Sequence, residues 1–289
     1  MSTPLCPVSI LIPTKNERSN IRACLETCRF AGEVVLVDSG SSDGTREIAL
    51  EFGASVIDFK WDGRFPKKKN WALANVPWRY EWIFILDADE RITPALAAEL
   101  CALLSGPSPG VAGFYVNRRF WFLDGWLLHC GYYPSWNVRL VRHRRCRFER
   151  FDEMGDTGSG DNEVHEQVLV DGPAGHLRHE MEHYAFPRID VWVEKHNRYS
   201  NWEARLIVSK ADHRADITAI RLPALARKRR LKLLAARLPF RPFLRFFYHY
   251  VLRAGFLDGY RGFVFCRLMG FYEFLSVAKA KELRRSESR

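Results

Sequence analysis

The chain has 289 residues, of which 47% are hydrophobic and 27% charged; this is the composition of a globular protein and excludes an intrinsically disordered chain. Its length suits one large α/β domain, or one domain with an appendage. The net charge of +10 is uneven, because residues 186–289 carry 23 Lys and Arg against 9 Asp and Glu, whereas residues 1–185 carry 21 against 25. The basic excess of the C-terminal part favours an anionic partner, either a membrane surface or nucleic acid.

The seven cysteines are odd in number and include no Cys-x-x-Cys pair, so we predict buried free thiols in a reducing compartment. The N-terminus enters a strand almost at once, without the basic and apolar regions of a secretory signal. No uncharged apolar run reaches the roughly 18 to 20 residues that a spanning helix needs. The expected location is therefore cytoplasmic, or peripheral to a membrane.

Short apolar runs separated by polar turns dominate the first 60 residues. The predicted elements are strands at 8–13, 33–38 and 54–59, a helix at 20–29, and a helix that follows the turn-rich segment 38–45 and reaches Phe52. Strands that alternate with helices indicate βαβ units and a parallel sheet. We expect the polar loops after these strands, which carry Thr14, Asn16, Glu17 and Asp38, to share one edge of that sheet.

A fourth apolar run, residues 82–86, ends in three carboxylates within four residues: Asp87, Asp89 and Glu90. The run reads as a strand buried on both faces, and ligands bind at the carboxyl ends of such strands. Side chains two apart on an extended segment point the same way, so Asp87 and Asp89 are expected to converge on a divalent cation. The competing interpretation is a solvated loop, since Asp-x-Asp is a common tripeptide.

Residues 65–75 form a predicted helix with Pro66 near its first turn and three lysines, 67–69, beside it. Cations at a helix N-terminus suit a phosphate group. A solvated basic first turn is the alternative, because lysines are usually exposed.

An amphipathic helix is predicted at 93–104, and from 113 to 170 the pattern changes to strands and irregular structure rich in aromatic residues. We expect most of these aromatics in the core and a minority on sugar rings. A glycine-rich loop at 155–160 precedes an acid-His-acid cluster, 163–166, at the start of a strand.

The C-terminal part combines a predicted helix at 190–210, a basic cluster at 227–232, and arginines at steps of four or eight from Arg237 to Arg253. Aromatic residues stand between these arginines. Steps of four keep the charges on one helical face and the aromatics on the other, which is typical of a helix that lies in a membrane interface. The alternative is a helix whose aromatic face packs on its own domain while its arginines face water.

Taken together, these motifs resemble those of the family 2 glycosyltransferases of the GT-A fold, and most closely the bacterial β-glucosyltransferases of lipopolysaccharide core assembly. The motifs lie at residues 12–17, 37–45, 69–73, 86–90, 139–140, 164–166 and 255–262. The resemblance covers nearly the whole chain, and the order and spacing of the motifs carry it.

The resemblance implies a role for individual residues. Those implied to border the nucleotide of a sugar donor are Pro13, Thr14, Asn16 and Glu17, with Glu17 near the ribose. Asp38 would bond the base, which favours uracil, although many relatives have two acids where this chain has Asp38-Ser39. Lys69 would approach the diphosphate, Asp87 the ribose or the metal, and Asp89 the metal itself. The implied cofactor is Mg²⁺ or Mn²⁺, which neutralises the departing diphosphate.

An inverting transfer also needs a carboxylate that takes the proton of the acceptor hydroxyl. Glu166 is the candidate base, with Glu153, Asp156 and Asp161 as upstream alternatives.

The expected architecture is an α/β GT-A domain over residues 1–185, with a mostly parallel central sheet and helices on both faces, followed by a helical, basic, membrane-associating region over 186–289. The expected reaction moves a hexose, glucose from UDP-glucose, to a lipid-linked saccharide, the inner core of lipopolysaccharide. The enzyme would work from the cytoplasm, peripheral on the inner face of the bacterial inner membrane. Another nucleotide sugar for another envelope polysaccharide, or a non-catalytic binder of nucleotide sugar and anionic lipid, are the alternatives.

Parts of the sequence also fit two other classes of protein, a zinc peptidase and a nucleic-acid-binding protein. Residues 179–183 match the zincin signature His-Glu-x-x-His, but that motif needs a helix, and Pro187 and the segment 172–175 leave too little room for one. We therefore expect a strand of partly exposed polar residues there. Nucleic-acid binding would fit the basic cluster, but no recognition module accompanies it, so we expect no nucleic-acid partner.

Overall fold

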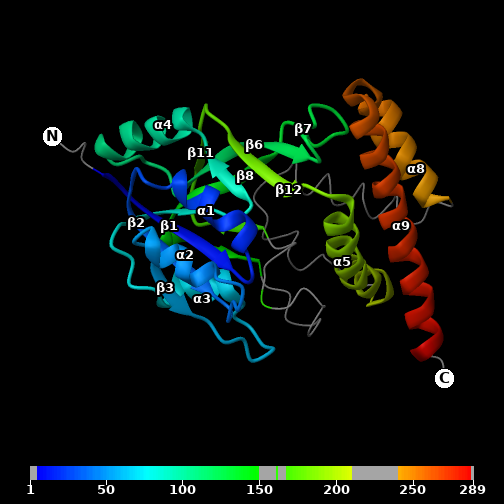
Figure 1. The fold of residues 1–289 in the computed structure, drawn as a ribbon, viewed down its shortest axis with the longest axis horizontal. Helices are drawn as coiled ribbons and strands as arrows, with labels where there is room; N and C mark the ends of the chain where they lie inside the picture. The colour runs from blue at the N-terminus through cyan, green and yellow to red at the C-terminus, as the bar shows by residue number, and fades with distance from the viewer. Residues whose placement is uncertain (1–4, 150–160, 162–166, 210–239, 288–289) are drawn as a thin grey trace. The chain divides into compact units, whose positions relative to one another are not determined.

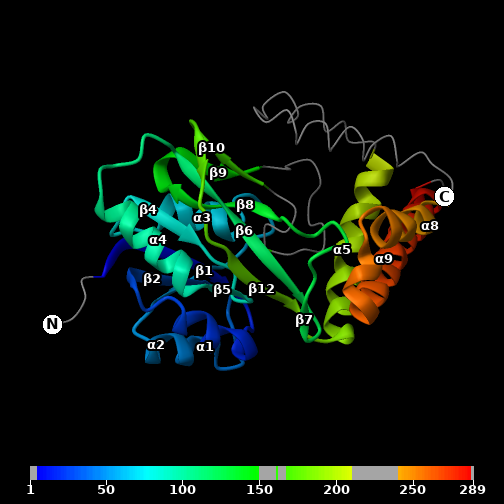
Figure 2. The same cartoon turned by 90° about the horizontal axis from the view of Figure 1, so that it is seen from above.

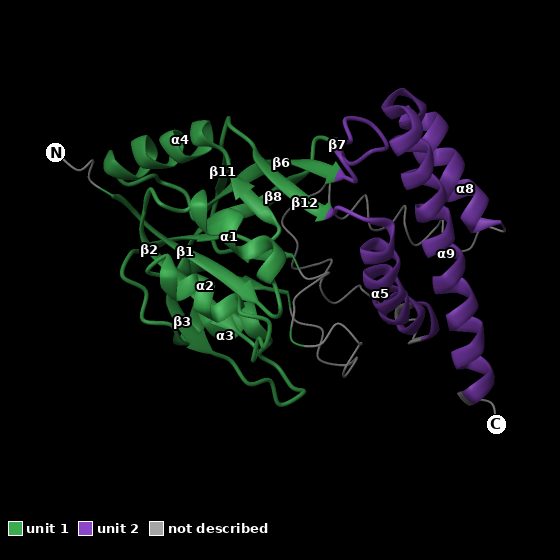
Figure 3. Cartoon of the chain, in the orientation of Figure 1, with its two compact units in different colours: residues 1–121, 133–155, 160–185 green, residues 122–132, 156–159, 186–289 purple. Residues whose placement is uncertain are grey.

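The computed structural model describes residues 5–149, 161, 167–209 and 240–287. They form two compact units (Figure 3). The first unit holds the described residues within 1–121 and 133–185. The second unit holds 122–132 and the described residues within 186–289. All seven cysteines are free thiols.

Strands and helices alternate in the N-terminal half of the first unit (Figure 1). In chain order they are β1 (Cys6–Thr14), α1 (Arg18–Glu26), β2 (Ala31–Asp38), α2 (Thr45–Glu51), β3 (Ser55–Asp58), α3 (Lys68–Asn75), β4 (Trp82–Ile85), β5 (Glu90–Ile92) and α4 (Pro94–Ser105). Strands β3, β2, β1 and β4 are neighbours in that order and all run parallel. The predicted βαβ units and parallel sheet are confirmed.

The rest of the first unit extends this sheet with mostly antiparallel strands and adds a separate two-stranded ribbon. Its elements are β6 (Gly113–Phe122), β8 (Trp136–Arg142), the 3₁₀ turn η1 (His143–Arg145), β9 (Cys146–Phe148), β10 (Val168–Val170), β11 (Ala174–His176) and β12 (Met181–Phe186). Strand β8 runs antiparallel to β4 and to β6, and β12 antiparallel to β5. The main path through the sheet is β3-β2-β1-β4-β8-β6-β12-β5, a mixed sheet whose first half is parallel. Off this path, β11 pairs with β6 in the parallel sense, and β9 and β10 form a separate two-stranded sheet.

Apolar side chains cover both faces of the central strands. In β4, Phe84 packs into the core under α1, α2 and α4, whereas Ile83 and Ile85 pack into the core under α3. Figure 2 shows α1 and α2 on one side of the sheet and α3 with the β9–β10 ribbon on the other. Each such side chain contributes about 1.5–3 kcal/mol on burial. Two packed layers therefore hold the strand ends in place, and the parallel register sets Thr14 beside Asp38.

The second unit is mainly helical. It contains the short strand β7 (Gly125–Trp126), α5 (Ile189–Ser209), α8 (Arg241–Phe247), the π-helical turn η3 (Tyr248–Leu252), the 3₁₀ turn η4 (Gly255–Asp258) and α9 (Gly259–Glu287). Lys279 on α9 ties α9 to α5 by donating to the carbonyl of Asn197 and the hydroxyl of Ser200, both at 2.8 Å. The predicted basic cluster at 227–232 lies outside the described residues. Over the part of the chain that is described, no helix combines the length and apolar character needed to cross a membrane.

In α8, two arginines face the interior of the unit and two phenylalanines face outward. Arg241 and Arg245 point inward and both form ion pairs with Glu273 of α9, the second at 3.6 Å. Phe243 and Phe247 point outward and are 69% and 50% exposed. For these four residues of α8, the interpretation in which the aromatics pack inward and the arginines face water is wrong, whereas Arg253 is exposed and Phe246 packs on Tyr250 within the unit.

His249, on the inward side of η3, gives the second unit a pH-dependent stability. It is 7% exposed, and its Nδ1–H donates to the carbonyl of Cys130 at 2.6 Å. Burial, together with the neighbouring cations Arg245 and Arg253, lowers the pKa of His249 to about 4. Because an unfolded histidine has a pKa near 6.5, the unfolded chain binds a proton first as the pH falls, and folding stability decreases between about pH 6.5 and 4.

We expect this decrease to reach roughly 3 kcal/mol in the free energy of unfolding. Urea unfolding of the wild type and of His249→Gln, followed from pH 7 to pH 4, measures it. The difference in stability between the two proteins should shrink as the pH falls, since only the wild type carries this proton linkage. A difference that stays constant would contradict the assignment.

Candidate active site

The loops that follow β1 and β2 are joined by a buried carboxylate. Asp38 has no exposed surface; its Oδ1 accepts from the Thr14 hydroxyl at 2.9 Å, and its Oδ2 accepts from the N–H of Ser41 at 2.8 Å. Arg46 lies 3.4 Å from the same Oδ2. Asp38 thus organises the turn at the end of β2, and its contact with a nucleotide base stays a prediction.

The predicted nucleotide-binding residues of the β1 loop lie against the same turn. Pro13 is buried, and Asn16, with a φ of 55°, donates its N–H to Ser41 at 2.8 Å. The N–H of Glu17 donates to the hydroxyl of Thr45 at 2.9 Å. These bonds join the two loops into one wall of the site at the carboxyl edge of the parallel strands.

The segment after β4 is a turn, not the extended segment predicted from the sequence. The N–H of Glu90 donates to the carbonyl of Asp87 at 2.9 Å, and the N–H of Asp87 donates to the Glu90 carboxylate at 2.9 Å. These bonds close the chain on itself, so strand alternation does not apply to Asp87 and Asp89. Each aspartate consequently has its own partners.

Asp87 is held between two cations. Its Oδ1 lies 2.9 Å from Lys69 Nζ and its Oδ2 lies 2.9 Å from Arg139 Nη2. Burial opposes the charge on Asp87, but these two cations outweigh burial and hold the pKa of its carboxyl well below the usual range. Because both oxygens are already paired, we assign to Asp87 the positioning of Lys69; its contact with a ribose or a metal stays a prediction.

Arg139 reaches the site because β8 carries a bulge. Leu140 pairs with Phe114 and Val138 pairs with Tyr115, which leaves Arg139 as the extra residue. Bulges of this kind redirect a side chain and are common beside active sites. Arg139, 6% exposed, turns inward to Asp87 and to the fully buried Glu90.

Glu90 balances this charge, since its carboxylate also accepts from Arg118 at 3.0 Å. Replacing Arg139 by Met leaves a buried carboxylate short of one partner, and we expect a loss of about 3–5 kcal/mol in unfolding free energy. Chemical denaturation measures the loss, and the double change Arg139→Met, Glu90→Gln should recover part of it.

The exposed pair Arg22 and Glu51, 2.7 Å apart, supplies the control. Arg22→Met should cost less than about 1 kcal/mol. Equal losses for Arg22→Met and Arg139→Met would contradict the role given to the buried network.

Asp89 faces β12. Its Oδ1 lies 3.5 Å from Nε2 of His183, and both side chains are about 15% exposed (15% and 16%). Strand β12 brings His183 there because it pairs with β5, with His183 opposite Glu90. The other ring nitrogen of His183, Nδ1, is buried without a hydrogen-bond partner in the described part of the chain.

A carboxylate oxygen and an imidazole nitrogen at this separation fit two neighbouring ligands of one divalent cation. Among the described residues, no three His, Cys, Asp or Glu side chains gather into a complete metal site. Mg²⁺ and Mn²⁺ commonly take few protein ligands and complete their shell with water and substrate phosphate oxygens. The pair Asp89 and His183 therefore suits a cation that is shared with a diphosphate, and the imidazole favours Mn²⁺ over the harder Mg²⁺.

The lysines at the start of α3 are buried, so the solvated alternative is wrong for two of them. Lys68 has no exposed surface, and Lys69 is 7% exposed. Lys68 Nζ donates to the carbonyl of Thr14 at 2.7 Å and lies 3.1 Å from the carboxylate of Asp161. Asp161 also accepts from the hydroxyl of Ser39. Asp161 is thereby anchored at the carboxyl edge of the parallel strands.

Glu166, the predicted base, lies outside the described residues, as do the alternatives Glu153 and Asp156. Asp161 is described, and its carboxylate is engaged by the ion pair with Lys68 and by the hydroxyl of Ser39.

The zincin alternative is excluded by the local fold. His183 lies on strand β12, not on a helix, and His179 pairs with Glu99 at 2.9 Å. The strand predicted for this segment is confirmed.

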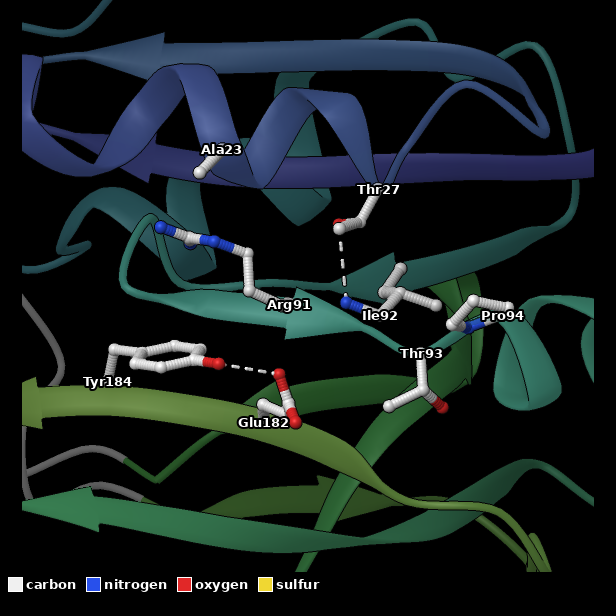
Figure 4. A pocket seen from close by; sticks show the side chains of 8 residues that line it. All are labelled: Ala23, Thr27, Arg91, Ile92, Thr93, Pro94, Glu182 and Tyr184. Carbon is white, nitrogen blue, oxygen red and sulfur yellow. Dashed lines mark hydrogen bonds between the residues drawn. The ribbon is translucent and has the colours of Figure 1, made fainter. Parts of the chain in front are cut away.

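A separate pocket lies between α1 and the paired strands β5 and β12 (Figure 4). It is lined by Ala23, Thr27, Arg91, Ile92, Thr93, Pro94, Glu182 and Tyr184. Its polar groups are satisfied within the chain: Arg91 donates to three backbone carbonyls, and Tyr184 donates to Glu182 at 2.7 Å. The pocket does not include the aspartates of the site, and we assign no chemistry to it.

The mixed sheet, with its acidic turns and buried lysines at the carboxyl ends of the parallel strands, defines a GT-A-like α/β fold. The sequence comparisons give the family. The chain belongs to glycosyl transferase family 2, whose model matches residues 9–162. The predicted family and fold class are thus confirmed.

Relatives found by sequence agree with this assignment. The lipopolysaccharide core biosynthesis glycosyltransferase LpsC of Rhizobium meliloti (strain 1021) is 30% identical, over 70% of this chain and 72% of its own. An uncharacterized glycosyltransferase of Rickettsia bellii (strain RML369-C) is 25% identical, over 96% and 86%. Among solved structures, the mannosyltransferase PcManGT of Pyrobaculum calidifontis in complex with GDP-Man and Mn²⁺ is 17% identical, covers 96% of this chain and 88% of its own, and has a TM-score of 0.46.

Proposed function

We propose that the protein is a metal-dependent, inverting hexosyltransferase that moves glucose from UDP-glucose to a lipid-linked saccharide, the inner core of lipopolysaccharide. The metal-dependent part of the proposal rests on the site at the carboxyl edge of the sheet. There, Asp89 pairs with His183, and the buried Lys69 pairs with Asp87, two residues before Asp89. The choice of acceptor is supported by the name of the Rhizobium meliloti relative, a lipopolysaccharide core biosynthesis enzyme.

The charge of the site matches what the leaving group needs. When the bond between the sugar and the diphosphate breaks, its electron pair stays on the diphosphate, which gains negative charge. A divalent cation held by Asp89 and His183 would neutralise part of that charge. Lys69, oriented by Asp87 at 2.9 Å, would add a second positive charge that is already in place before the reaction.

The acceptor side requires a base. In the proposed single displacement, Glu166 takes the proton of the acceptor hydroxyl while the hydroxyl oxygen attacks the anomeric carbon opposite the diphosphate. The products are UDP and a glycoside of inverted configuration, and the proton remains on Glu166.

We place the reaction at the inner face of the bacterial inner membrane, where the enzyme would be peripheral and bound to anionic lipid through its C-terminal region. The +14 balance of residues 186–289, which comes from 23 basic and 9 acidic residues, supports an anionic surface as partner. No nucleic-acid partner is proposed.

A donor screen tests the proposal. The purified protein is incubated with Mn²⁺ and UDP-glucose, UDP-galactose or GDP-mannose, with intact and delipidated lipopolysaccharide core as acceptors, and nucleotide release and acceptor mass are measured. We expect the fastest release from UDP-glucose, with one hexose added to the core. Preference for another donor would favour a different envelope polysaccharide, and no release from any donor would favour a non-catalytic binder.

A further inference from the structure

Exposed apolar side chains are concentrated in one part of the second unit. Of the twenty large apolar side chains that are exposed among the described residues, thirteen lie between residues 240 and 274. They are Phe240, Phe243, Leu244, Phe247, Tyr248, Val251, Leu252, Phe256, Leu257, Tyr260, Phe263, Phe271 and Phe274, and we refer to them as the tail patch. So many large exposed apolar side chains within one short part of a soluble protein indicate an interaction site.

Helical periodicity places part of the tail patch on one side. Along α8 and η3, Phe243, Phe247 and Val251 follow one another at steps of four residues, which places them on one helical face. The opposite face is already occupied, because Arg241 and Arg245 are bound to Glu273. The helix therefore cannot turn its aromatic side inward without breaking two ion pairs.

Aromatic contacts inside the unit reinforce this orientation. Phe246 stacks on Tyr250 at 5.1 Å between ring centroids, and Phe263 meets both rings edge to face. These rings join α8 and η3 to the first turns of α9. The outward side chains are thus presented by a packed scaffold.

Charge identifies the kind of partner. Apart from Arg241 and Arg245, which pair with Glu273, residues 227–267 contain nine Lys and Arg and a single acid, Asp258, a balance of +8. A second copy of the chain would bring the same charge and be repelled, and nucleic acid offers little apolar surface to thirteen large side chains. An anionic lipid bilayer supplies both acyl chains for the apolar groups and headgroup charge for the basic ones.

We propose that the tail patch inserts into the surface of an anionic bilayer, with its phenylalanines and leucines among the upper acyl segments, and that the net positive charge of this part of the sequence attracts the chain to the headgroups. Arg241 and Arg245 do not contact lipid in this arrangement, because they hold α8 to α9. The inference deepens the proposed function by naming the residues that bind the membrane, and it rests on that function only for the acceptor.

Sedimentation with sucrose-loaded vesicles tests the proposal without requiring turnover. The full chain is mixed with vesicles of phosphatidylglycerol and phosphatidylethanolamine, or of phosphatidylcholine alone. The double variant Phe243→Ser, Leu252→Ser removes two side chains that are 69% and 65% exposed, and Leu5→Ser, Leu50→Ser removes two that are 57% and 61% exposed in the first unit. Circular dichroism confirms that each variant is folded.

We expect the tail-patch variant to bind anionic vesicles at least about tenfold more weakly than the wild type, since each lost side chain gives up apolar burial. The first-unit variant should bind like the wild type. Between about 0.1 M and about 1 M salt, wild-type binding should weaken but persist, because screening removes only the electrostatic part.

Two results would overturn the proposal. Equal binding by wild type and tail-patch variant would show that the patch does not insert. A wild-type dimer that dissociates in the tail-patch variant, with no binding to vesicles, would make the patch an interface between copies of the chain. If the vesicle result is as expected but no donor is turned over, only the proposed transferase function fails.

Discussion

Replacing Asp89 by Asn is expected to lower kcat/KM for UDP-glucose by about 10²–10³-fold, the cost of removing one group that stabilises developing charge in a transition state. The amide keeps the shape of the side chain but loses the charge that a hard cation requires. Asp89 is 15% exposed at its side chain, so the change should leave the fold intact. UDP release measures the rate, and the paramagnetic signal of free Mn²⁺ measures metal binding.

His183→Asn is the companion variant. Loss of one ligand should weaken Mn²⁺ binding by roughly 10–100-fold, and excess Mn²⁺ should restore activity more fully than in Asp89→Asn. Asp171→Asn, at an exposed carboxylate in the loop before β11, is the matched control and should behave as wild type. An Asp89→Asn enzyme with normal turnover and normal Mn²⁺ binding would remove Asp89 from the site.

Replacing Glu166 by Gln is expected to lower kcat by about 10²–10⁴-fold, the usual contribution of a positioned general base. The glutamine side chain has a similar size but does not take a proton. Binding of UDP should be unchanged, because the base acts on the acceptor and not on the nucleotide. Turnover rates and UDP affinity, measured on the same preparation, separate the two effects.

The neighbouring acids are the controls for Glu166. Glu153→Gln and Asp156→Asn should retain most of the activity. Asp161→Asn should impair the enzyme for a different reason, because it breaks the ion pair with Lys68 at 3.1 Å. This variant should therefore lose folding stability as well as turnover rate. If Glu166→Gln keeps its kcat while Glu153→Gln or Asp156→Asn loses it, the base is the other acid.

The parallel half of the sheet was predictable because each of its strands is a short apolar run that ends in a polar loop. The two faces of β4 alternate between two cores, as with Phe84 and Ile85, so the run has no polar side. That pattern identifies a doubly covered strand, and the carboxyl edge of the sheet follows from it. The loops with Thr14, Asp38 and Asp89 could be assigned to one edge on this basis.

The partners of the site residues could not be predicted in the same way, because they depend on pairing across the sheet. Arg139 meets Asp87 through a bulge in β8, and His183 meets Asp89 because β12 pairs with β5. Neither contact can be recognised from the residues that neighbour it in the sequence. In the sequence, His183 stands out only as part of a His-Glu-x-x-His motif, which indicates a zinc peptidase and not this site.

Burial of charge was the other point that periodicity did not reveal. Lys68 looks like an exposed lysine within a run of three, yet it is fully buried because Asp161 and the Thr14 carbonyl satisfy it. In the second unit, the steps of four correctly separated arginines from aromatics. They did not indicate which face points inward, since that depends on Glu273, some thirty residues away on α9.

The most direct test of the central claim is UDP release from UDP-glucose in the presence of lipopolysaccharide inner core, first with Mn²⁺, then with an excess of chelator, and then with Mn²⁺ restored. A cation held by Asp89 and His183 predicts that release depends on the core acceptor, stops in chelator, and returns with the metal. Release that continues unchanged in chelator would contradict the metal-dependent transfer proposed for this site.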